Sequence, residues 1–133
     1  MLFPFPMSYQ QTVKEIESTF GSMPEFFKNT PQDVLTQMWP LMKKYGLGES
    51  VIPQKYREMM ALAAAAALKC PYCQTFHRES AKMFGASEAE LNELATVVAQ
   101  TSFWSAILHT QNYDMNTFMK ELQAMGEYMS KKQ

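Results

Sequence analysis

The sequence carries little net charge, and its charges are spread along the chain. Lysine and arginine together number 12, against 13 aspartate and glutamate residues, which leaves a net charge of −1. No stretch forms a basic arm or an acidic tail. Because binding to a phosphate backbone needs clustered positive charge, nucleic acid is not an expected partner.

Long hydrophobic segments are also missing. The longest apolar run, Met59 to Leu68, is about half the roughly 20 residues that a membrane span needs. The apolar start, MLFPFPM, has two prolines and no basic segment, so it does not predict a signal peptide. We expect a cytoplasmic protein without membrane contact, whose apolar start packs against its own or a neighbouring subunit.

No alternating pattern predicts a strand, and we find no internal repeat. Apolar residues instead recur at helical spacing between turn signals, such as capping boxes that begin at Ser8 and Ser87. Pro40 lies inside one helical pattern, where a kink or break is expected. The stretch YGLGES, residues 45–50, is predicted to be a loop. The sequence therefore predicts an all-α protein with one domain over residues 1–133.

The two cysteines, scarce as they are, come together in LKCPYCQTFHRES with one of only two histidines. Pro71 restricts Cys70 to extended geometry, so one helix should stop at Cys70 and another should start at Pro71. Cys73 then lies in the first turn, where free N–H groups favour a thiolate, and its pKa should fall below that of Cys70. His77, one turn further along, can accept its proton. These residues indicate a nucleophilic Cys73 that can form a disulfide with Cys70.

Two other interpretations of this stretch remain open. Both cysteines could be small packed residues, with His77 as an ordinary surface histidine. A structural zinc site would need four ligands, and the stretch supplies three. His109 or Glu58 could complete such a site, although nothing in the spacing indicates it.

A wider pattern includes a glutamate upstream. The residues Glu58-x11-Cys70-x2-Cys73-x3-His77, followed by Ala81 and Gly85, resemble the signature of the AhpD-like alkylhydroperoxidases within the carboxymuconolactone decarboxylase family. The resemblance covers residues 53–95. It implies an AhpD-like helical bundle that assembles into homo-trimers or homo-hexamers.

The resemblance also implies an activity, that of a thiol-dependent peroxidase of the peroxiredoxin type, an oxidoreductase without a cofactor. Cys73 would attack the peroxide and Cys70 would resolve the sulfenic acid to a disulfide. Glu58 and His77 would form the proton relay through water. A dithiol would reduce the disulfide, and in AhpD itself that reductant is a lipoyl-bearing protein. Some members carry a histidine before the second cysteine, where this sequence has Tyr72.

Two further functions are compatible with the sequence. A decarboxylase or ring-opening enzyme of the wider family would need an acid and a base but no dithiol. A non-catalytic helical assembly module would need neither. The apolar stretch VVAQTSFWSAIL, residues 97–108, and a methionine stripe from Met115 to Met129 both indicate buried faces within or between subunits.

The proposed relay raises a geometric question. In one straight helix, Glu58 lies about 18 Å along the axis from Cys70, whereas His77 lies only about 10 Å along the returning helix. The two side chains would be about 8 Å out of step. Crossing helices, an early break, a bridging water or a glutamate from another subunit could close that gap.

Overall fold

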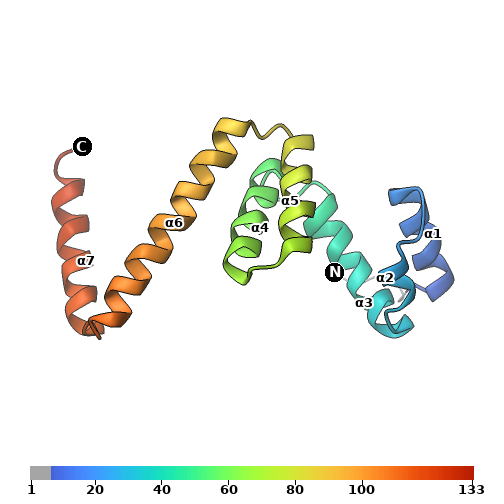
Figure 1. Cartoon of the computed structure of the whole chain (residues 1–133), viewed down its shortest axis with the longest axis horizontal. Helices are drawn as coiled ribbons and strands as arrows, with labels where there is room; N and C mark the ends of the chain where they lie inside the picture. The colour runs from blue at the N-terminus through green and yellow to red at the C-terminus, as the bar shows by residue number, and fades with distance from the viewer. Residues whose placement is uncertain (1–6) are drawn as a thin grey trace.

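The computed structural model describes residues 7–133, so the expected packing of the first six residues lies outside it. Every regular element of the described part is helical, which confirms the predicted all-α class (Figure 1). In chain order the elements are α1 (Tyr9–Phe20), α2 (Glu25–Lys28), α3 (Gln32–Met42), the π-helix η1 (Lys43–Leu47), α4 (Gln54–Leu68), α5 (Pro71–Met83), α6 (Glu88–Thr110) and α7 (Met115–Ser130).

The predicted capping boxes form as expected. Ser8 accepts the Gln11 N–H at the start of α1, and Ser87 accepts the Glu90 N–H at the start of α6. In both boxes the glutamine or glutamate side chain bonds back to the N–H of the capping serine. These contacts satisfy N–H groups that a helix start otherwise leaves without partners.

Two predictions about the middle of the chain are wrong in part, since no break occurs at Pro40 and residues 45–47 are not loop. Helix α3 continues through Pro40 to Met42, and the irregularity follows as the π-helical turn η1. The predicted loop 45–50 is loop only over residues 48–50, because residues 45–47 belong to η1. Wider π-type turns place backbone carbonyls differently from an α-helix, and they are frequent at functional sites.

The N-terminal helices share one small core. Ile16 of α1, Phe27 of α2, and Leu35 and Trp39 of α3 are all buried there. The Trp39 indole N–H donates to Glu15 at 3.0 Å, so the largest buried side chain also has its polar group satisfied.

Helices α4 and α5 form an antiparallel hairpin in the middle of the chain (Figure 1). Lys69 turns the chain between them in the left-handed conformation, with φ of 57°. Small side chains permit this close pairing, since Ala65 of α4 and Ala81 of α5 are almost wholly buried. Ala81 belongs to a second small core with Leu91 of α6.

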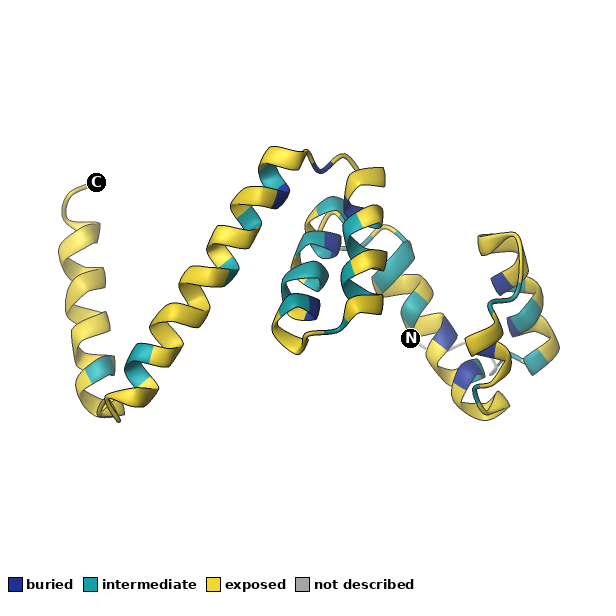
Figure 2. Ribbon diagram, viewed as in Figure 1, coloured by how far each residue is buried: buried dark blue, intermediate teal, exposed yellow. Residues whose placement is uncertain are grey.

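The C-terminal helices leave most of their apolar surface uncovered (Figure 2). Trp104 of α6 is 59% exposed, and the stripe residues Met119, Leu122 and Met125 of α7 are each at least half exposed. These stretches are therefore not buried within the chain. None of the helices within residues 7–133 is long and apolar enough to cross a membrane.

Candidate active site

The two cysteines meet at the start of α5. Cys70 is the N-cap residue and Pro71 the first helical residue, as the sequence predicts. The N–H of Cys73 donates to the sulfur of Cys70 at 3.3 Å, and the two sulfurs lie 2.8 Å apart. Both cysteines are free thiols, and both are half-buried. The side chains therefore converge, as a dithiol that can form a disulfide requires.

The acidity of the two thiols differs from the prediction. By distance alone either thiol could donate across the sulfur–sulfur contact, but the Cys73 N–H already donates to Cys70. The hydrogen bond from the Cys73 side chain, and then that backbone N–H, lower the pKa of Cys70. The pKa of Cys73 is raised, first by the same contact with Cys70 and then by burial. The expectation that Cys73 is the more acidic thiol is wrong here, because the Cys73 N–H at the helix start donates to the sulfur of Cys70.

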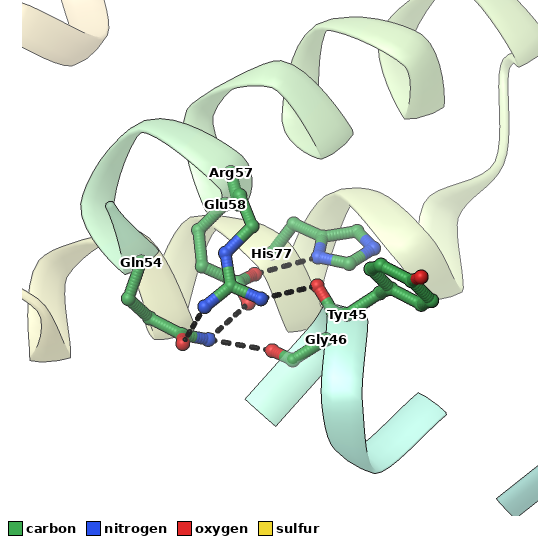
Figure 3. Close-up of polar contacts among 6 residues, drawn as sticks. All are labelled: Tyr45, Gly46, Gln54, Arg57, Glu58 and His77. Atoms are coloured by element: carbon green, nitrogen blue, oxygen red, sulfur yellow. Dashed lines mark hydrogen bonds and ion pairs between the residues drawn. The ribbon is translucent and has the colours of Figure 1, made fainter. Parts of the chain in front are cut away.

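A glutamate–histidine pair lies between the helices of the hairpin. Oε2 of Glu58, from α4, is 2.7 Å from Nδ1 of His77, from α5 (Figure 3). The Glu58 side chain is 5% exposed and that of His77 is 26% exposed. A carboxylate can only accept a hydrogen bond, so Nδ1 carries the proton and Nε2 is left as an acceptor. The arrangement gives His77 the form that a general base needs.

This direct contact answers the geometric question about the relay. Helix α4 ends at Leu68, two residues before Cys70, which shortens the axial offset. The side chains of Glu58 and His77 then bridge the remaining separation within one chain. Neither a bridging water nor a glutamate from another subunit is needed to join them.

Sequence reasoning missed a layer of contacts behind Glu58. Nε2 of Gln54 lies 2.5 Å from the Gly46 carbonyl oxygen and 3.3 Å from Oε1 of Glu58. Arg57 donates to Oε1 of Gln54 and to the backbone carbonyl of Tyr45 (Figure 3). It also donates to the backbone carbonyl of Gly48. The contact between Gln54 and Glu58 could have been predicted from the sequence, because residues four apart lie on one face of a helix.

Two sequence hypotheses find no support in the geometry. Tyr72 is 86% exposed, and its phenol makes no hydrogen bond to any described residue. It therefore does not replace a relay histidine in this conformation. Within residues 7–133, no group of three or more His, Cys, Asp or Glu side chains gathers where it could hold a metal ion.

Comparison with known proteins fixes the family of the chain. The crystal structure of the alkylhydroperoxidase AhpD core from Rhodospirillum rubrum superposes with a TM-score of 0.71 at 22% sequence identity, covering 84% of this chain and 85% of that one. It shares the fold. No curated protein matches the sequence. The sequence profile of the carboxymuconolactone decarboxylase family matches residues 34–112, more than half of the chain. By that match, the chain belongs to the carboxymuconolactone decarboxylase family.

Proposed function

We propose that this protein is a thiol-dependent peroxidase that uses Cys70 and Cys73 as a redox pair. The observation that carries the proposal is the combination, in one helical hairpin, of two converging free thiols with a hydrogen-bonded Glu58–His77 pair whose carboxylate is buried. Oxidation of a thiol by a peroxide needs a proton acceptor and a proton donor in turn, which such a pair supplies. A second thiol nearby converts the first product into a disulfide.

The first step is attack by Cys73 on a peroxide ROOH. Cys73 and His77 are four residues apart on α5 and so lie on one helix face. Nε2 of His77 takes the thiol proton as the sulfur attacks the terminal oxygen of the peroxide. The O–O bond breaks, and the imidazolium returns that proton to the departing RO⁻. The products are the sulfenic acid of Cys73 and the alcohol ROH.

The second step forms the disulfide. The thiolate of Cys70, whose proton has passed to solvent, attacks the sulfur of the sulfenic acid, and the hydroxyl group leaves as water with a proton taken from solvent. The lowered pKa of Cys70 suits this resolving role, because a thiolate is the attacking species. An external dithiol then reduces the disulfide, and the family resemblance points to a lipoyl-bearing protein as that dithiol. The overall reaction converts ROOH and a dithiol into ROH, water and a disulfide.

The raised pKa of Cys73 does not conflict with its role as nucleophile. A thiol that stays protonated at rest needs a base, and His77 is one turn, about 6 Å of helix rise, from Cys73. Cys70 is about 10.5 Å of rise from the same histidine. Cys70 is thus the better resting thiolate, whereas Cys73 is closer to the group that can protonate the departing oxygen.

The decisive experiment measures consumption of hydrogen peroxide and of an organic hydroperoxide by the reduced protein with a dithiol donor. Cys73→Ser should abolish consumption, and reduced Cys70→Ser, assayed without the donor, should consume one equivalent of peroxide and stop at a sulfenic acid. A decarboxylase or ring-opening enzyme of the family would use the Glu58–His77 pair without the thiols. Its activity would survive both substitutions, which separates the two functions.

We also propose that the protein works as a homo-oligomer, a trimer or hexamer. The chain exposes 10674 Å², whereas a compact monomer of its mass would expose about 7,100 Å². The excess, about 3,500 Å², exceeds the 1,200–2,000 Å² that a typical stable interface buries in total. An open pocket of about 840 Å³ between the α4–α5 hairpin and α6 is lined mostly by apolar side chains, including Leu62, Leu94 and Val98, with Lys69 and Arg78 among its polar residues. A second copy of the chain is the proposed cover, since its α7 carries an exposed apolar stripe that also needs covering.

A further inference from the structure

We infer that Gln54 is a positioning residue for the Glu58–His77 pair, and that Arg57 sets the orientation of its amide. The inference rests on the proposed function, in which that pair moves the proton of Cys73. Apart from His77, Gln54 is the only described side chain that bonds to the Glu58 carboxylate. It connects the relay to the end of η1 (Figure 3).

The orientation of the Gln54 amide is forced by its neighbours. A guanidinium can only donate, so the amide oxygen must face Arg57, whose Nη2 lies 2.6 Å away. A carbonyl and a carboxylate can only accept, so the amide nitrogen must face Gly46 and Glu58. All three partners require the same orientation. A flipped amide would set its oxygen against two acceptors and its nitrogen against a donor.

Arg57 is itself fixed by the end of the π-helical turn. The last carbonyls of a helix have no partner within the helix. Arg57 donates to the carbonyl of Tyr45 and to that of Gly48, the C-cap residue after η1, and Gln54 donates to that of Gly46. Within the described residues Arg57 forms no ion pair with a carboxylate. Its guanidinium is therefore used to hold backbone and amide oxygens in place.

This arrangement acts on the relay through Glu58. With Oε1 held by Gln54, the carboxylate cannot rotate freely, and Oε2 stays directed at Nδ1 of His77. The proton of the neutral imidazole is then kept on Nδ1, which leaves Nε2 free to accept a proton from Cys73. Loss of the Gln54 donor should let the carboxylate rotate and let the imidazole proton distribute between both nitrogens.

The test compares Gln54→Met and Gln54→Glu with a matched control, Gln123→Met. Methionine keeps much of the volume of glutamine but cannot donate. Glutamate keeps the acceptor for Arg57, which favours a folded protein, but it sets a carboxylate against Glu58. Gln123 makes the same type of contact, from Nε2 to a glutamate Oε1 four residues later, at 3.0 Å on the exposed helix α7. Its replacement should leave the relay unchanged.

The first readout is the protonation of the two His77 ring nitrogens, measured by ¹⁵N NMR on the full chain at neutral pH. We expect the Nδ1–H form in the parent protein and in Gln123→Met, and a mixture of forms in both Gln54 variants. An unchanged Nδ1–H form in a folded Gln54→Glu variant would overturn the inference.

The second readout is peroxide turnover, which we expect to fall about tenfold in the Gln54 variants, as typical for loss of an outer-shell partner. An absence of turnover in the parent protein would refute the proposed peroxidase function and leave the NMR result to decide the role of Gln54. An active parent whose Gln54 variants keep both full turnover and the Nδ1–H form would refute the positioning role alone.

Discussion

Replacing Glu58 with glutamine should separate the activity of this protein from its stability. The carboxylate is nearly buried and makes two side-chain contacts, with His77 and with Gln54. In Glu58→Gln the new amide oxygen can still accept from Gln54, but the new NH₂ group faces Nδ1 of His77. The imidazole must then carry its proton on Nε2, where it can no longer accept one from Cys73.

The expected change in the free energy of unfolding is small because two terms oppose each other. Exchanging a hydrogen bond to a charged group, about 1.5–3 kcal/mol, for a neutral one, about 0.5–1.5 kcal/mol, costs about 1–1.5 kcal/mol. Removing a buried charge recovers part or all of that, because burying an ion costs several kcal/mol. We expect a net change within about 2 kcal/mol. Turnover should fall by about 100-fold or more, the usual contribution of general acid–base catalysis.

The assay combines urea unfolding at neutral pH with peroxide consumption at saturating dithiol. The matched control is Glu15→Gln, since Glu15 also accepts from two side chains, those of Trp39 and Lys43, but lies beside the N-terminal core. The control should keep its turnover. Turnover in Glu58→Gln within about threefold of the parent protein would refute the relay. A loss of more than about 3 kcal/mol would instead identify Glu58 as a mainly structural residue.

Three other predictions follow from the thiols, an acid-sensitive pair and the exposed helices. Because its pKa is lowered, Cys70 should be alkylated before Cys73 as pH rises toward neutrality; peptide mass spectrometry that found Cys73 labelled first would contradict this. Lys43, and then Trp39, lower the pKa of Glu15 below its usual 4.5, so the stability that this carboxylate supplies should be present above that pH and lost below it. Urea midpoints measured across the acid range should therefore fall less steeply in Glu15→Gln, and equal slopes would disprove the assignment. Light scattering should give a mass several times 15.3 kDa for the parent protein and a lower mass for Leu122→Glu, whereas a monomeric parent would exclude the proposed assembly.

Local signals in the sequence were enough to predict the helices and the start of α5. Capping boxes and Pro71 act over three or four residues, so they can be identified from neighbouring positions alone. The approach of the two sulfurs followed from the same reasoning, because Cys70 and Cys73 share one helix start.

The parts that sequence reasoning missed depend on contacts between elements or on competition for one donor. The direct Glu58–His77 contact depends on how α4 and α5 pair, which no periodicity specifies. The acidity of Cys70 depends on which sulfur receives the Cys73 N–H. The role of Arg57 depends on which carbonyls lie free at the end of η1, and the sequence did not predict that this helical turn ends at Leu47.

The hairpin that carries the site also has a consequence for folding. The relay residues Glu58 and His77 are 19 positions apart, and both cysteines lie between them in the sequence. Closing so short a loop costs little conformational entropy, and contacts at short sequence separation favour fast folding. During synthesis the hairpin leaves the ribosome before α6 and α7. The residues of the proposed site can therefore come together before the exposed apolar helices emerge. The order of elements along the chain thus lets the proposed site form ahead of the exposed apolar helices that we propose for assembly.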